Sequence, residues 1–272
     1  MMRSMYSGVS GMRGFQTKLD VIGNNIANVN TVGFKSSRVM FKDIISQTVS
    51  GVTAPDGTDQ GGVNSKQIGL GVTVGSIDTV HLGGSAMTTN QPTDLRIDGD
   101  GFFLVKLSGD QEEPFLTRAG DFHIDADRNL VTSDGLFVCG ADKAPIQLSD
   151  QVVTFSIAQD GRIIQKLKDG TTDSGSQLGV AKVINPEGLE KIGGNLYRMT
   201  VNANPDGDLV VTTANNEAEG TGAIIAGQLE MSNVDLTNEF TEMIVAQRGF
   251  QANSRIITTS DEVLQEVVNL KR

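Results

Sequence analysis

The chain has 272 residues, of which 33 are acidic and 22 are Lys or Arg, for a formal net charge of −11. Nucleic-acid binding needs basic surfaces, so this charge argues against a nucleic-acid partner. The single cysteine, Cys139, excludes an intrachain disulfide. No apolar run reaches the ~18 residues of a membrane helix, and the first residues lack the apolar core of a signal peptide. We therefore expect neither membrane insertion nor a cleaved signal.

Residues 1–33 are predicted to form a helix that glycines weaken. Apolar residues recur at every seventh position, as in a coiled-coil seam, while each interior glycine costs roughly 1 kcal/mol of helix propensity. A cluster of Asn and Gly at 28–33 predicts the helix end. We expect this helix to need a packing partner. Its seam residues are Met5, Met12, Leu19 and Ile26.

The middle of the chain divides into two predicted regions. Residues 34–90 are predicted to be an extended linker region, and within it 51–71 is rich in Gly, Thr, Asp, Gln and Asn without apolar periodicity. Residues 91–231 show short apolar runs separated by Asp-Gly turns at 98–101, 134–135, 160–161 and 206–207. Asp-Gly between such runs favours hairpins, so we expect a central antiparallel β domain.

Residues 232–272 predict one long helix of roughly 35 residues, because they contain no proline and a single glycine. Ser232 and Asp235 fit a capping signal at its start. A second strict seam of spacing seven runs along it, and the companion positions four residues further on are polar in the middle, at Gln247, Ser254 and Asp261. The seam residues are Leu236, Met243, Phe250, Ile257 and Leu264.

The fold class predicted from these elements is α+β. Long N- and C-terminal helices, within 1–33 and 232–272, pair in a coiled-coil-like unit, and the central antiparallel all-β domain is inserted between them. The pair could be parallel or antiparallel. The narrow seams favour helices that assemble with other copies of the chain, and the alternative is a long helix packed on the chain's own β domain.

The sequence predicts no enzyme, cofactor or metal site. Asp98 and Asp100 could form a carboxylate pair, but Asp-Gly at a turn is the simpler explanation. His81 and His123 are the only histidines and have no Cys or His at metal-ligand spacing. Cys139 lies in an apolar run and is expected to be buried. No nucleotide-binding or nucleophile-elbow motif occurs.

Three stretches of the sequence resemble the flagellar rod and hook proteins, a family of bacterial flagellar axial proteins. They are DVIGNNIANVNTVGFK at 20–35, IDGDGFFLV at 97–105, and the C-terminal segment 232–272. Together they place the resemblance over nearly the whole chain. The first carries the family signature, which consists of Asn24, Asn25, Asn28, Gly33 and Phe34.

The resemblance implies a self-assembling subunit of the flagellar axis. It implies a homopolymer in the form of a helical tube, built through the terminal helices and exported by the flagellar type III apparatus without a cleaved signal. Neighbouring rod, hook-cap or junction proteins would be its partners. Residues 3–12 and 246–272 look more like the hook protein, and we therefore expect the hook, a flexible joint that transmits motor torque to the filament. The chain length and the segment at 51–71 favour the alternative, the rigid distal rod. A cap or adaptor that does not polymerise, or an enzyme, would be other classes.

Overall fold

The computed structural model describes residues 2–54, 61–109, 111, 113–205 and 207–270. It divides the chain into two compact units. We call residues 1–27, 37–79 and 235–272 the helix–ribbon unit, and residues 28–36 and 80–234 the β unit. Among the described residues the α-helices are α1 (Met2–Ala27) and α2 (Leu236–Asn269), so helix and antiparallel sheet are mixed and the sheets lie between the helices in sequence.

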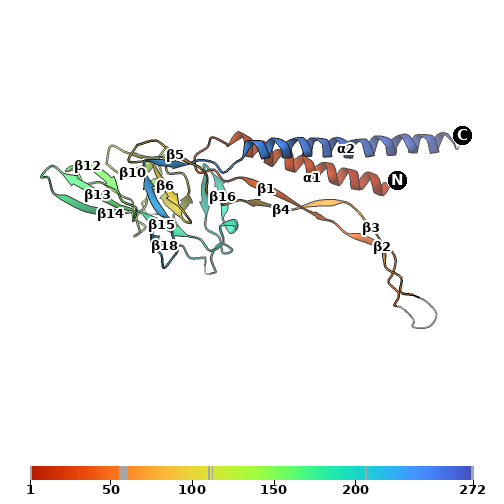
Figure 1. Cartoon of the computed structure of the whole chain (residues 1–272), viewed down its shortest axis with the longest axis horizontal. Coiled ribbons are helices and arrows are strands. Elements are labelled where there is room, and N and C mark those ends of the chain that lie inside the picture. Colours follow the sequence, from red (N-terminus) through yellow and green to blue (C-terminus); the bar gives the residue numbers. More distant parts are fainter. Residues whose placement is uncertain (1, 55–60, 110, 112, 206, 271–272) are drawn as a thin grey trace. The chain divides into compact units, whose positions relative to one another are not determined.

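The helix–ribbon unit contains both helices and a two-stranded ribbon. The helices lie side by side with both chain ends at the same end of the pair, so they are antiparallel (Figure 1). The helix lengths match the prediction: α1 ends just before the Asn and Gly cluster, and α2 has 34 residues. The predicted cap needs correction, because the cap of α2 is Asp235, whose carboxylate accepts the Thr237 N–H, and not Ser232.

The region predicted to be extended is paired in an antiparallel ribbon. Strand β1 (Ser37–Asp43) pairs with β4 (Val72–Thr79), and β2 (Ser46–Ser50) pairs with β3 (Lys66–Gly69). Backbone hydrogen bonds from Ile44 to Gly71 and from Leu70 to Ile45 join the two pairs into one ladder. The ladder continues to a bridge between Thr53 and Val63. The middle of the predicted 51–71 segment, 55–60, lies outside the described residues.

The β unit is built on a strand whose five residues are all buried, β7 (Phe102–Lys106). Successive side chains of a strand point to opposite faces. Accordingly, Phe103 and Val105 belong to one hydrophobic cluster, whereas Phe102 and Leu104 belong to a second. Strand β7 is therefore covered on both faces, and its neighbours β8, β11 and β15 pair with it antiparallel.

Within the described residues, the remaining strands of the β unit complete a nine-stranded antiparallel sheet and three smaller ones. The large sheet contains β7, β8 (Phe115–Thr117), β9 (Phe122–Ile124), β10 (Leu130–Thr132), β11 (Phe137–Val138), β15 (Gly179–Lys182), β16 (Glu190–Gly193), β17 (Leu196–Arg198) and β18 (Val210–Thr213). The smaller sheets are β12 (Val152–Ile157) with β13 (Arg162–Leu167) and β14 (Thr172–Gln177), β6 (Leu95–Asp98) with β19 (Ala223–Ala226), and β5 (Ala86–Thr88) with β20 (Gln228–Glu230). A 3₁₀ turn spans Pro186–Gly188.

Two of the predicted Asp-Gly hairpins are confirmed, and the one predicted at 206–207 includes Asp206, which lies outside the described residues. The turn at 134–135 joins β10 to β11, and the turn at 160–161 joins β12 to β13. The hairpin predicted at 98–101 is wrong, because β6 pairs with β19 and β7 pairs with other strands. Gly99 and Gly101 both have positive φ, +121° and +137°, far from the values near +60° that a tight primed turn requires.

Candidate assembly surface

Small residues allow the two terminal helices to approach closely. Gly8 and Gly11 are buried on α1, and a Cβ atom on Gly11 would lie 2.9 Å from the Asn253 side chain of α2. Further along the pair the glycine is on α2 and the large side chain on α1: a Cβ on Gly249 would lie 2.6 Å from the Phe15 ring. The glycines that weaken α1 in isolation therefore create the contact that stabilises it in the pair.

Polar contacts fix the antiparallel register of the pair. The Lys18 ammonium pairs with the Glu242 carboxylate, and Asn25 Nδ2 donates to Glu239 Oε1 over 3.0 Å. Burial is the main cause that raises the pKa of Glu239, although the Asn25 hydrogen bond opposes the rise. Residue numbers therefore increase along α1 in the direction in which they decrease along α2, as in an antiparallel pair.

Most predicted seam residues are half-buried. The side chain of Ile257 lies 3.5 Å from the position of a Cβ on Gly8, so it packs directly on α1. Leu236 and Phe250 are the most open of the seam positions on α2, with 38% and 37% of their surface exposed. The half-buried members are Met5, Met12, Leu19, Ile26, Met243, Ile257 and Leu264.

The row of α2 residues that faces α1 beside the seam differs from the predicted companion row, which lies four residues after each seam position. Ala246 is fully buried and Asn253 contacts Gly11, so the row lies three residues after the seam positions rather than four. Gln247 and Asp261 are exposed instead. Positions +3 and +4 flank a helix seam on opposite sides, and the glycine face of α1 meets the +3 side, where small side chains allow contact.

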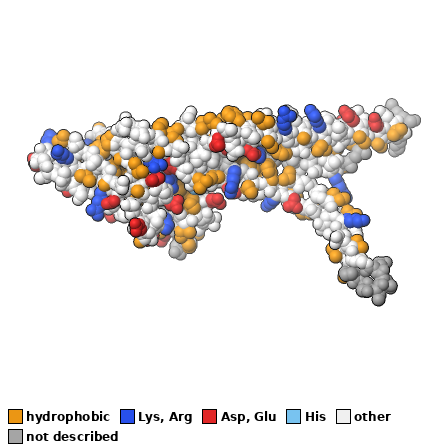
Figure 2. Space-filling model, viewed as in Figure 1, with side chains coloured by type: hydrophobic (Ala, Val, Ile, Leu, Met, Phe, Trp, Pro, Cys, Tyr) orange, Lys and Arg blue, Asp and Glu red, His pale blue; other side chains and the backbone are white. Residues whose placement is uncertain are grey.

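The helix–ribbon unit keeps many large apolar side chains exposed. On α2 they form rows that do not face α1, and Figure 2 shows hydrophobic side chains gathered over part of this helix. A monomeric protein rarely exposes a large contiguous apolar patch unless another surface covers it. The exposed apolar residues of α2 include Phe240, Ile244, Val245, Ile256, Val263, Val267 and Val268.

The glycine contacts lead to a first prediction, on the stability of the helix pair. Replacing Gly249 by Leu should destabilise the pair by about 1–3 kcal/mol, because the new side chain would collide with Phe15. Gly23 is a matched control, since a Cβ atom at this position would meet nothing within 4 Å, and Gly23→Leu should leave stability unchanged or raise it by up to ~1 kcal/mol. Thermal melting followed by helical circular dichroism compares the two; equal melting temperatures would contradict the close approach.

The signature residues occupy the end of α1 and the turn that follows it. Within the helix–ribbon unit, the buried Asn25 side chain accepts the Ser37 N–H over 3.0 Å and donates to the Ser37 carbonyl over 2.8 Å. It thereby attaches the start of β1 to α1. Asn24 is exposed on α1, and Asn28 accepts a hydrogen bond from the Thr31 hydroxyl over 3.2 Å.

Gly33 and Phe34 belong to the β unit. Gly33 has φ of +69°, and a Cβ there would lie 2.5 Å from the Ala119 backbone nitrogen, so only glycine fits. Phe34 is 3% exposed, and the Lys191 ammonium lies 4.2 Å from its ring centroid. The signature therefore has a structural explanation in backbone geometry and packing.

The sequence did not reveal a buried ion cluster in the β unit. Glu230 Oε1 lies 2.6 Å from Lys35 Nζ, Glu230 Oε2 lies 3.4 Å from Arg118 Nη1, and the Gly84 N–H donates to Oε1 over 3.1 Å. The side chains of Lys35 and Glu230 are 1% and 2% exposed. Burial favours the neutral form of Glu230, but Arg118 and Lys35 together outweigh it and lower the pKa of Glu230. The two cations therefore favour the carboxylate form of Glu230, whereas burial lowers the pKa of Lys35.

A side-chain amide next to the ion cluster joins three chain segments. Asn233 Oδ1 accepts the Ser36 N–H and its Nδ2 donates to the Val80 carbonyl, both over 2.8 Å. Val80 N–H in turn donates to the Ser36 carbonyl over 2.8 Å. These residues lie where the β-unit segments 28–36 and 80–234 begin or end. Asn233 thus holds those ends together.

His81 is held neutral beside the cluster. Its ring packs on Phe102 and Tyr197, with centroids 5.8 and 5.5 Å away. Burial, followed by the positive charges of Lys35 and Arg118, lowers the pKa of His81 to about 4. Its buried Nδ1 finds no hydrogen-bond partner within the described part of the chain.

A second prediction concerns acid stability. An unfolded histidine binds a proton near pH 6.5 and folded His81 only near pH 4, so the folded state should lose stability as pH falls between these values. Below about pH 4 His81 should cause no further loss. His81→Phe keeps a ring and should flatten the slope of unfolding free energy against pH in this window. Urea titrations from pH 7 to pH 4 test it, with exposed His123→Phe as the control. Parallel curves for His81→Phe and the unchanged protein would contradict the assignment.

The sequence singled out Cys139 and possible metal ligands as candidates for chemistry. Burial raises the pKa of the Cys139 thiol to about 11, so it is not a nucleophile near neutral pH. Across 2–54, 61–109, 111, 113–205 and 207–270, no three His, Cys, Asp or Glu side chains cluster as metal ligands. In the same part of the chain, neither helix has a stretch apolar and long enough for a membrane span.

Comparison with known proteins places these features in a class. Residues 5–35 match the family model "Flagella basal body rod protein", 96–165 match "Flagellar hook protein FlgE/F/G D1 domain", and 225–270 match "Flagellar basal body rod FlgEFG protein C-terminal". The fold and these matches define a structural protein of the bacterial flagellum.

Full-length relatives make the assignment specific to a family. The chain is 54% identical over 273 residues to the flagellar basal-body rod protein FlgG of Bacillus subtilis, with all of both chains covered. It is 36% identical over 275 residues to FlgG of Borreliella burgdorferi, and 31% identical over 451 residues to the flagellar hook protein FlgE of that organism, again with full coverage. The chain belongs to the flagellar basal-body rod and hook protein family. This confirms the family resemblance and a role in motility.

Proposed function

We propose that this chain is the subunit of the distal rod of the flagellar basal body, a rigid drive shaft polymerised through its terminal helices. The supporting observation is the alignment length. Rod relatives align over 273 and 275 positions, nearly the 272 residues of this chain. Hook relatives align over 451 and 472 positions and therefore require large additional segments. The comparison supports the rod alternative better than the hook favoured by the C-terminal segment.

In this proposal the helix pair forms the inner wall of a tube. Half-buried seam residues such as Met12, Met243 and Ile257 pack α1 against α2 in a coiled-coil-like pair, and the exposed rows of α2 pack against neighbouring copies. We further propose that residues 1–33 and 232–272 act as the assembly domain, 34–90 as an extended connection, and 91–231 as the outer domain. The paired ribbon around 51–71 would stiffen the tube through contacts between subunits.

The proposed setting follows from the family. The subunit would leave the cell through the flagellar type III apparatus without cleavage, and would meet neighbouring rod, hook or junction proteins at the ends of the tube. No catalytic role is included in the proposal.

Electron microscopy of the concentrated full-length chain tests polymerisation. Straight tubes are expected for a rod subunit. Curved or supercoiled tubes would favour the hook. Failure to polymerise at any concentration, together with a folded monomer, would favour a cap or adaptor of the same system and overturn the proposal.

A further inference from the structure

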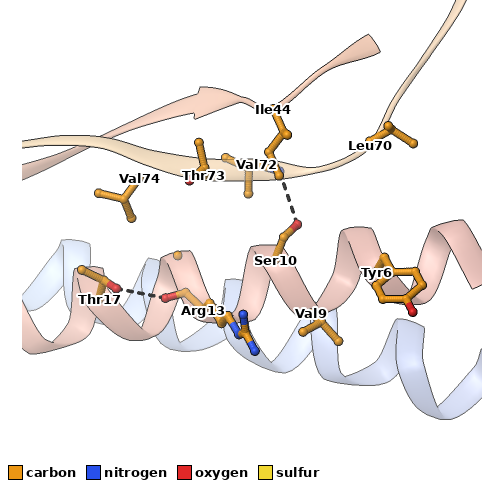
Figure 3. Close-up of a pocket in the computed structure, with 11 residues that line it drawn as sticks. Tyr6, Val9, Ser10, Arg13, Thr17, Ile44, Leu70, Val72, Thr73 and Val74 are labelled. Atoms are coloured by element: carbon orange, nitrogen blue, oxygen red, sulfur yellow. Dashed lines mark hydrogen bonds between the residues drawn. The ribbon is translucent and has the colours of Figure 1, made fainter. Parts of the chain in front are cut away.

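A groove lies between α1 and the ribbon inside the helix–ribbon unit. It has a volume of about 430 Å³. Figure 3 shows the ribbon passing over α1, with Ser10 reaching up from the helix to accept the Val72 N–H over 3.4 Å. Its lining is mostly apolar, and it includes one charged side chain, Arg13, on α1. Its lining residues include Tyr6, Val9, Arg13, Ile44, Leu70 and Val74.

The C-terminal turns of α2 extend beyond the start of α1. Gly8 lies level with the segment between Asn253 and Ile257, and the helices are antiparallel. At 1.5 Å per residue, Met2 is level with a position near 261, so residues 262–269 run on for about 12 Å without α1 beside them. Figure 1 shows α2 continuing past the N-terminal end of α1. We call residues 262–270 the overhang.

The overhang carries an apolar row suited to a groove. Val263, Val267 and Leu270 are 44%, 51% and 86% exposed. They are spaced i, i+4 and i+7, the pattern by which an amphipathic helix lies in an apolar groove. This row is distinct from the seam, since Leu264 lies on the half-buried side. A rigid helix pointing away from α1 cannot turn back into the groove of its own chain.

The described residues of the overhang and the groove lining carry opposite charges. Asp261, Glu262 and Glu266 are the charged residues between 256 and 270, and all are acidic and exposed. The charge that lines the groove is Arg13, and its exposed side chain lies on the groove wall. Opposite charges beside an apolar contact fix its orientation and register.

We propose that the overhang of one copy docks in the α1–ribbon groove of the next copy. The contact joins two different surfaces and is therefore heterologous, so repetition gives an open helical polymer rather than a closed dimer. The groove follows α1 from Tyr6 to Thr17, about 17 Å at 1.5 Å per residue, which accommodates the overhang. This inference rests on the proposed function, because it names the surfaces through which subunits polymerise.

Site-directed cross-linking tests the pairing directly. Thr73→Cys places a thiol in the groove and Val267→Cys places one on the overhang, while the native Cys139 is buried with a raised pKa and does not compete. The two single variants are mixed, concentrated into polymers and treated with a short bismaleimide. Dimers that join one variant to the other are expected. Val153→Cys, on an exposed β-unit residue, replaces Val267→Cys in the control and should give no such dimer.

Charge exchange gives an independent readout in full-length protein. Arg13→Glu and Glu266→Arg should each raise the critical concentration for polymerisation about threefold to tenfold, and the double variant should largely restore it. Glu266→Arg combined with Arg38→Glu, whose side chain lies outside the groove, should not be restored. Circular dichroism verifies that each variant is folded.

The outcomes separate the two proposals. Polymers without the Thr73–Val267 cross-link, or without recovery in the double variant, would overturn the groove pairing and leave self-assembly intact. A folded, unsubstituted chain that never polymerises would overturn the proposed function and the pairing with it.

Discussion

Replacing Glu230 by Gln should destabilise the β unit by about 3–5 kcal/mol. The substitution keeps the shape of the side chain but leaves Lys35 and Arg118 as buried positive charges without a counter-ion. Burial already lowers the pKa of Lys35, and the Glu230 carboxylate only partly offsets it. Removing that carboxylate should therefore lower the pKa of Lys35 further. Urea unfolding at pH 7 measures the loss.

Two further variants sharpen this experiment. Glu190→Gln removes an exposed ion pair with Arg198 and should cost less than about 1 kcal/mol, which controls for the chemical change itself. Lys35→Met together with Glu230→Gln removes one of the two buried positive charges that lack a counter-ion. This double variant should therefore recover part of the lost unfolding free energy. If Glu230→Gln is no more destabilising than Glu190→Gln, the cluster does not stabilise the unit as described.

Replacing Ile257 by Asp should abolish polymerisation. The Ile257 side chain packs on α1 beside Gly8, and a carboxylate there would lie in an apolar contact at a cost of roughly 3 kcal/mol or more. Such a loss raises the critical concentration by more than about a hundredfold. Phe250→Asp should act in the same direction but less strongly on the isolated pair, because Phe250 is 37% exposed.

Sedimentation and electron microscopy at increasing concentration measure this effect. Thr258→Asp is the matched control, because it adds the same charge one residue further on, at an exposed position of α2. The β unit should keep its sheet signal in both variants. Normal tubes from Ile257→Asp would show that this seam position is not required for assembly.

Helix positions could be predicted because their signals are local. The absence of proline, the sevenfold apolar spacing and the Asn and Gly cluster at 28–33 are all visible within one segment. The bounds of α1 and α2 follow them closely. The companion row could not be predicted, because it depends on which face of α2 meets the glycines of α1, a property of the pair rather than of one segment.

Strand pairing was predictable only where partners are neighbours in sequence. Asp134 and Gly135 join adjacent strands, whereas Asp98 and Gly99 end a strand whose partner is Ala223–Ala226. The turn chemistry is similar in both, so local sequence cannot separate them. The ion cluster could not be predicted from local sequence either, because Lys35, Arg118 and Glu230 come from three segments that are distant in the chain. One visible signal was an acidic residue in the otherwise uncharged run GQLEM at 227–231.

The location of the subunit in the flagellum is the most direct test of the account. Isolated rods with hooks attached, stripped of their surrounding rings, can be labelled with immunogold through an antibody against the β unit. If the chain forms the distal rod, label is expected along the straight rod next to the hook and none on the curved hook. Label along the hook, or no label on the flagellum, would contradict it.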